Sequence, residues 1–285
     1  MRQDGYKLKG TNKMYTVAAH FMSERSDAMN MITIDIPVDS MHCFLNKKKK
    51  EGISISHLAL IISAYIRTVA EFPELNRFVV NRRYYAHKDF AVAMVVLKSG
   101  DRSHGIMSKC FFDLSDTVYD VNNKINNYIE KNRQSSSNNS TEKVINAFLS
   151  IPGLLRLGVP FVKFLDNIGL LPKAIIDASP FHNSLAISNL ASIKTNHIYH
   201  HCYNFGTTSV FITLGNKRQV PKEVNGEVKL ETCIPMGIVM DERICSGGYF
   251  ALAFRKFEKY LKNPEILESK PDKITPDPNI PQKRQ

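Results

Sequence analysis

The chain has 285 residues, with 38 Lys and Arg against 27 Asp and Glu, so its formal net charge is +11. With 43% hydrophobic and 23% charged residues, its composition is that of a globular protein of one large or two small domains. No apolar run reaches the roughly 18 residues of a membrane span, and the first residues lack the apolar region of a signal peptide. The five cysteines are widely spaced and include no CxxC pair, which argues against a disulfide framework and a zinc site. We therefore expect a reduced, cytoplasmic protein.

The excess of basic residues comes partly from the run at 47–50 and partly from the tail at 270–284. No aromatic–basic interleaving, recognition-helix pattern or zinc module accompanies them, so we expect no nucleic-acid partner. We expect the run at 47–50 to be exposed. A basic surface also suits an acidic small molecule such as a nucleotide-bearing cofactor.

The first half of the chain alternates strands and helices. Residues 31–38 alternate polar and β-branched side chains and predict a strand, followed by a short helix at 41–46. Ser54 and Ser56 are possible N-caps of an apolar helix that Pro73 ends. Further on, the pattern predicts a hairpin-like pair of segments, 77–87 and 89–98, the second of them a buried strand. A strand near 110–112 and an amphipathic helix over 115–131 follow.

Two segments with opposite composition follow. Residues 134–140 (QSSSNNS) predict a flexible linker. Residues 141–179 are rich in Leu, Ile, Val and Phe but are interrupted by Pro152, Pro160 and Pro172, which favours two or three short helices. This apolar insert is either a helical cap on the core or a lid or interfacial segment.

Strands resume over 184–190, 209–215 and 232–244, with Asn225-Gly226 as the turn of a hairpin between the last two. A terminal helix is predicted over 249–261, and the proline-rich tail after Ser269 is expected to be disordered. The pattern predicts an α+β fold with a mixed β-sheet and flanking helices. We expect one domain over 1–268, with an insert at about 141–179 and a tail at 269–285.

Five segments, in the correct order, resemble the catalytic domain of the dihydrolipoamide acyltransferases of 2-oxoacid dehydrogenase complexes. They are FMSERSDAMNMITIDIPVD, ISISHLALIISAYIRTVAEFPELN, HKDFAVAMVVL, LAISNLASI and GIVMDERICSGGYFALAFRKFEKYLKNPEIL. The resemblance covers roughly residues 14–267 and implies the chloramphenicol-acetyltransferase-like fold, a homotrimer with active sites between subunits, and coenzyme A as cosubstrate. In that family a histidine of an HxxxDG motif is the general base, the aspartate of the motif holds an ion pair, and a serine of the neighbouring subunit stabilises the oxyanion.

The resemblance places Glu242 at the histidine position and Ser246 at the aspartate position, while Arg243 and Gly247 match the family and Ser188 matches the oxyanion serine. The implied catalytic residues are thus Glu242, Ser188 and Ser246. A glutamate needs burial to raise its pKa toward that of a general base, and Arg243 would instead favour the ionised form. Glu242 is therefore either the base or a carboxylate paired with an arginine.

The change to serine at position 246 has a different consequence. A buried arginine that lost its aspartate would be destabilised, so we expect the partner arginine to have changed or to be solvated, with Ser246 as a small hydrogen-bonding residue.

Another histidine is a candidate replacement base. The segment after the predicted strand 184–190, NHIYHHCYNFG, contains His197, His200 and His201. His200 and His201 are adjacent and, in an extended segment, would face opposite ways, so both cannot enter one site. They are either loop residues or, with Asn189, substrate-binding residues. The spacing does not predict a metal site, and we expect Cys202 and Cys245 to be buried rather than nucleophilic.

Three functions remain open. The first is a standalone acyltransferase that transfers an acyl group from acyl-CoA to a small acceptor. The second is a catalytically inactive relative, acting as a trimeric scaffold or as a small-molecule or lipid-binding protein. The third, less favoured, is a peripheral membrane protein in which the insert at 141–179 contacts acyl chains. No tightly bound cofactor is expected.

Overall fold

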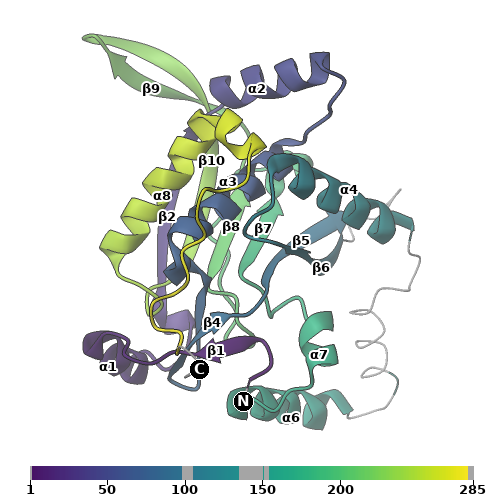
Figure 1. Cartoon of the computed structure of the whole chain (residues 1–285), viewed down its shortest axis with the longest axis vertical. Helices are drawn as coiled ribbons and strands as arrows, with labels where there is room; N and C mark the ends of the chain where they lie inside the picture. Colours follow the sequence, from purple (N-terminus) through teal and green to yellow (C-terminus); the bar gives the residue numbers. More distant parts are fainter. Residues whose placement is uncertain (1, 98–104, 135–149, 151–153, 282–285) are drawn as a thin grey trace.

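The computed structural model describes residues 2–97, 105–134, 150 and 154–281. Within them, a seven-stranded sheet has the strand order β2-β10-β8-β7-β5-β6, and β9 pairs with residues 227–233 of β10 (Figure 1). Its strands are β2 (Met29–Pro37), β5 (Phe90–Leu97), β6 (Gly105–Phe112), β7 (Leu185–Asn189), β8 (Val210–Leu214), β9 (Arg218–Val224) and β10 (Glu227–Asp241). Strand β7 is parallel to β5 and β8, whereas the other neighbouring strands of this sheet pair in antiparallel fashion. The sheet is therefore mixed, which confirms the predicted fold class.

A second, three-stranded sheet has the order β1-β4-β3. It consists of β1 (Gly5–Lys7), β3 (Arg77–Val80) and β4 (Arg83–His87). Strands β3 and β4 form a hairpin within residues 77–87, whereas β5 belongs to the main sheet, so the predicted pairing of 77–87 with 89–98 is wrong. The two turn residues, Asn81 and Arg82, both have positive φ values of 49° and 57°. Such a turn matches the twist of the strands but is strained for residues other than glycine.

The helices group on one face of the main sheet and at its ends (Figure 1). They are α1 (Lys13–Phe21), α2 (Asp39–Lys50), α3 (His57–Glu71), α4 (Val118–Gln134), α6 (Leu154–Ile168), α7 (Lys173–Ala178) and α8 (Gly247–Lys262). Helix α3 begins where the Ser56 hydroxyl accepts a hydrogen bond from the Ala59 N–H at 3.0 Å, and it ends two residues before Pro73, as predicted. Helix α3 packs against α8, and its apolar side chains belong to the main hydrophobic core. It is therefore buried from Ala59 to Ala70. A helix buried on all sides has no polar face.

The lysine run lies inside α2 rather than in an exposed loop, because the helix extends beyond the predicted 41–46 to Lys50. Lys48 is buried, and its ammonium contacts the carboxylates of Glu268 at 2.6 Å and Glu51 at 3.0 Å. Its aliphatic stem can cover apolar surface while the charge is paired, and the ammonium lies 5.7 Å from the Phe44 ring. The expectation of a wholly exposed run is thus wrong at Lys48.

The tail is not disordered over residues 270–281, contrary to the expectation. Arg77 donates two hydrogen bonds to the Asp277 carboxylate, at 2.5 and 2.9 Å, and both residues are buried. The Thr275 N–H donates to the carbonyl of Ala70 at 2.8 Å, and the Asn279 carbonyl accepts from Lys9. Polar contacts thus hold a segment that has too little apolar surface to pack by itself.

The apolar insert is described only in part. Helices α6 and α7 confirm two of the short helices predicted there, whereas residues 135–149 and 151–153, with most of the predicted linker, lie outside the described residues. None of the described helices is both long and apolar enough to cross a membrane.

His87, at the end of β4, gives the stability of the fold a dependence on pH. Its Nε2 atom is shielded from solvent and has no hydrogen-bond partner among the described residues, and the centre of its ring lies 4.5 Å from that of Phe78. Burial lowers the pKa of His87 to about 3 although Asp4 opposes this. Between about pH 6.5 and 3 the unfolded chain therefore binds a proton that the folded chain does not, so stability falls as pH falls through this range.

We expect the free energy of unfolding to decrease by about 3 kcal/mol between pH 7 and pH 4 through this histidine. Urea titrations at the two pH values measure the decrease, and His87→Gln should remove that part of it. Parallel pH profiles for the two proteins would contradict the assignment.

Candidate active site

Glu242 directly follows the C-terminal end of β10. Its N–H donates to the Ala28 carbonyl at 2.8 Å, and its half-buried carboxylate accepts a hydrogen bond from Asn30 Nδ2 at 2.7 Å. No ion pair with an arginine or lysine involves Glu242 in the described part of the chain. The described residues therefore show no arginine paired with Glu242, and Arg243 has a different partner.

That partner is Asp241, which is fully buried. Arg243 donates to the two carboxylate oxygens of Asp241 at 2.8 and 2.7 Å, and Arg25 Nε lies 3.4 Å from the same carboxylate. Both guanidinium groups are 2% exposed. Burial lowers the pKa of Arg25 although Asp241 opposes this. One carboxylate thus neutralises part of the charge of two buried arginines.

Ser246 takes no part in this ion pair. Its hydroxyl accepts a hydrogen bond from the Tyr249 N–H at 3.1 Å and caps the N-terminus of α8. The expected hydrogen-bonding role of Ser246 is thus present, whereas the expectation that the arginines are solvated or replaced is wrong. Asp241, at the end of the preceding strand, supplies the carboxylate that keeps both arginines paired while they are buried.

Ser188, near the end of β7, belongs to a row of small side chains across four strands. The register pairs Ser188 with Thr213, Thr213 with Gly237, and Gly237 with Thr33. Residues paired in this way point to the same face of a sheet, and this is the face opposite Ile187, Ile212 and Ile238 of the helix-covered core.

The loop after β7 crosses this row. A side chain at Gly237 would lie 2.4 Å from the carbonyl of Ile198, and one at Gly215 would lie 2.3 Å from the backbone nitrogen of His197, so both positions need glycine. His197 Nε2 lies 3.0 Å from the Thr33 hydroxyl, and the Tyr199 hydroxyl lies 2.5 Å from the same group. His197 is therefore the histidine that the structure places on the row of Ser188.

His200 and His201 lie further along the same loop. Their rings stack on each other at 4.8 Å, and His200 also stacks on Phe211 of β8 at 4.2 Å. The expectation that adjacent histidines face opposite ways is therefore wrong: the loop is not a strand, and the Phe211 ring orients the pair. Asn189 is exposed at the end of β7, and its carbonyl accepts a hydrogen bond from Ser192.

Sequence reasoning missed Asn30, Thr33 and Tyr199. The alternation of Thr33 with Ile32 and Ile34 indicated that Thr33 lies on the opposite face of the strand from the two isoleucines. It could not indicate the partners of Thr33, which lie more than 160 positions away. Cys202 and Cys245 are buried, and burial raises the pKa of Cys202 to about 12 and raises that of Cys245 as well. Both thiols are thus protonated at neutral pH and poor nucleophiles.

Ser188 and Glu242 do not meet within one chain. Through Thr213 of β8, the register aligns Ser188 with Gly237 of β10, two strands away. Glu242 comes five positions after Gly237, directly beyond the end of β10. With about 3.3 Å per residue and about 4.8 Å between strands, the two residues are roughly 19 Å apart. One chain therefore does not bring the two matched catalytic positions together.

No protein-family model and no curated protein sequence matches the chain. Several solved structures match it in three dimensions. The probable dihydrolipoamide acetyltransferase of Listeria monocytogenes has a TM-score of 0.57 at 12% identity, covering 90% of this chain and 94% of that one. The cubic core of a pyruvate dehydrogenase multienzyme complex has a TM-score of 0.59 at 11% identity, covering 89% and 88%.

A chloramphenicol acetyltransferase has a TM-score of 0.55 at 12% identity, covering 90% of this chain and all of that one. These likenesses extend over nearly the whole of each protein. The chain therefore has the fold that the dihydrolipoamide acetyltransferase cores share with chloramphenicol acetyltransferase, as its five sequence segments predict.

Proposed function

We propose that this protein is a coenzyme A-dependent acyltransferase that transfers an acyl group from acyl-CoA to a small acceptor. We further propose that it acts as a homotrimer with its active sites between subunits. The acyltransferase-like fold supports the reaction class, and the net charge of +11 suits a cosubstrate that carries phosphate groups.

The observation that carries the proposal is the hydrogen bonding of the Glu242 carboxylate. Asn30 fixes one oxygen, and the other has no hydrogen-bond partner among the described residues, so it is available to accept a proton. A flexible glutamate needs such an anchor to act as a general base, which must lie within hydrogen-bond reach of the proton it removes.

The separation of roughly 19 Å between Ser188 and Glu242 supports a site made by two subunits. In this proposal, Glu242 of one subunit takes the proton from the acceptor hydroxyl or thiol as that group attacks the thioester carbon. Ser188 of the next subunit donates a hydrogen bond to the oxyanion. The carbon–sulfur bond then breaks, and the proton passes from Glu242 to the sulfur of coenzyme A.

One observation favours a second candidate, a catalytically inactive relative. The motif that supplies the base in the resembling family here contains no histidine, and Ser246 serves only to cap α8. Such a protein keeps the trimer as a scaffold or binds a small molecule or lipid without turnover.

The first experiment is a calorimetric titration of coenzyme A and acetyl-CoA into the purified protein, with light scattering on the same sample. We expect saturable micromolar binding and three times the mass of one chain. Binding absent at millimolar ligand would reject the acyl-CoA proposal, and a monomeric mass would reject the intersubunit site.

A further inference from the structure

Two helices at the same end of the molecule expose apolar stripes. Helix α1 exposes Met14, Val17 and Phe21, of which Phe21 is 84% exposed, and these residues are spaced by three and four positions. Helix α6 exposes Leu157, Phe161, Phe164 and Ile168, with Leu157 at 77%. Residues three or four positions apart lie on one side of a helix. Both helices lie at the lower end in Figure 1, opposite α2 and β9.

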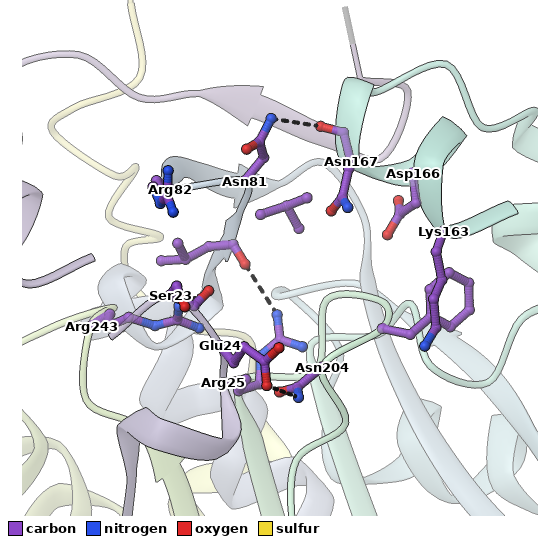
Figure 2. Close-up of a pocket in the computed structure, with 13 residues that line it drawn as sticks. Ser23, Glu24, Arg25, Asn81, Arg82, Lys163, Asp166, Asn167, Asn204 and Arg243 are labelled. Atoms are coloured by element: carbon purple, nitrogen blue, oxygen red, sulfur yellow. Dashed lines mark hydrogen bonds between the residues drawn. The ribbon is translucent and has the colours of Figure 1, made fainter. Parts of the chain in front are cut away.

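A cavity of about 380 Å³ lies between the two helices. Ser23 and Glu24, just after α1, line one side, and Lys163 and Asn167 of α6 line the other. Figure 2 shows Arg82, on the β3–β4 turn, and Lys163 on opposite sides of this cavity. Two exposed aromatic residues, Phe21 and Phe164, are close in sequence to the lining residues Ser23 and Lys163.

The cavity carries an excess of positive charge. Arg82 and Lys163 are exposed, and among the described residues neither side chain has a hydrogen-bond or ion-pair partner. Asp166 is paired with Arg2 at 2.6 Å, but Arg2 also pairs with Asp4 at 2.8 Å, and His182 is a further neighbour of Asp166. Arg25 and Arg243, which also line the cavity, share the single carboxylate of Asp241. Among the lining carboxylates, only Glu24 has no cationic partner; it accepts a hydrogen bond from Asn204.

The turn that positions Arg82 is strained. Two-residue turns with positive φ at both positions favour Asn-Gly, but here the second position is an arginine at a φ of 57°. Such strain at a cavity indicates a function for the side chain that it positions.

We propose that this end of the molecule docks on an anionic phospholipid surface, with the stripes of α1 and α6 in the acyl–headgroup boundary and a lipid phosphate in the cavity between them. Amphipathic helices with aromatic and leucine side chains on one face bind membranes in this way. Basic pockets beside apolar surface bind anionic headgroups.

The test is sedimentation of the full chain with vesicles of phosphatidylcholine alone and of phosphatidylcholine with phosphatidylglycerol. We expect binding to the anionic vesicles only. Phe161→Ser with Phe164→Ser should weaken it at least tenfold, and Arg82→Glu with Lys163→Glu should weaken it about fivefold or more for each cation lost. The matched controls, at the opposite end of the molecule, are Val228→Ser with Leu230→Ser for exposed apolar area and Lys49→Glu with Lys50→Glu for charge.

Retention of binding within twofold by both controls, together with its loss in both site variants, supports the proposal. Wild-type protein that stays in solution with either vesicle would overturn it, as would equal losses in controls and site variants. A changed oligomeric mass in the Phe161/Phe164 variant would assign the α6 stripe to contacts between subunits instead. Release from the anionic vesicles by millimolar inorganic phosphate at constant ionic strength would support a headgroup phosphate in the cavity, because free phosphate then competes for it. Binding of inorganic phosphate by wild-type protein that does not sediment with either vesicle would assign the cavity to free phosphate instead.

Discussion

Glu242→Gln is expected to lower the rate of acyl transfer from acetyl-CoA by about 10²- to 10⁴-fold, the usual contribution of a general base. Glutamine keeps the shape of the side chain and an oxygen that accepts the hydrogen bond of Asn30, so the variant removes the base but leaves its anchor in place. The release of the coenzyme A thiol measures the rate. Glu223→Gln, a change of an exposed glutamate on β9, is the matched control and should keep the wild-type rate.

The same experiment tests whether the site lies between subunits. Ser188→Ala alone should lower the rate by about 10²- to 10³-fold, the contribution of one oxyanion donor. When the two inactive variants are coexpressed with different tags and the mixed trimers are isolated, these should recover about one third of the wild-type activity, because one of the three sites in each mixed trimer has both residues intact. Recovery is impossible if both residues act within one chain. An unchanged rate in Glu242→Gln would assign the base to a histidine, with His197 the first to replace.

Features that depend on neighbours in the sequence were predicted well. The spacing of apolar residues and the serine before them defined α3, because both the helix and its cap are set within a few positions. Asn225-Gly226 defined the turn between β9 and β10 in the same way, and both residues have positive φ.

Features set by distant partners were not predicted. Composition indicated a disordered tail, but Asp277 pairs with an arginine 200 positions away. The proline content of a segment describes its tendency to pack alone and contains no information on such a contact. The stacking of His200 on Phe211 similarly required the strand beneath the loop to be known.

In the candidate site, too, features set by neighbouring residues were predicted, whereas contacts with distant residues were not. Aligned motifs located Glu242 and Ser188, but the side chain that anchors Glu242 belongs to β2, 212 positions earlier. The pairing of Arg25 and Arg243 with Asp241 was likewise not predicted, because the motif does not show which carboxylate a buried arginine contacts. Asp241 and Arg243 flank Glu242, so their pairing also fixes the backbone on both sides of the proposed base.

This pairing leads to the largest expected effect on stability. Asp241→Asn should lower the free energy of unfolding by about 3–5 kcal/mol, because it leaves the buried charges of Arg25 and Arg243 without a counter-charge. Guanidinium titrations measure the change, and a constant slope would show that the unfolded state is unaffected. The matched control is Asp35→Asn, which breaks a two-bond contact with the exposed Arg218 and should cost at most about 1 kcal/mol. Adding Arg25→Met to Asp241→Asn should restore part of the loss, since it removes one of the two uncompensated charges. If Asp241→Asn proves as mild as Asp35→Asn, the buried arginines do not depend on this carboxylate.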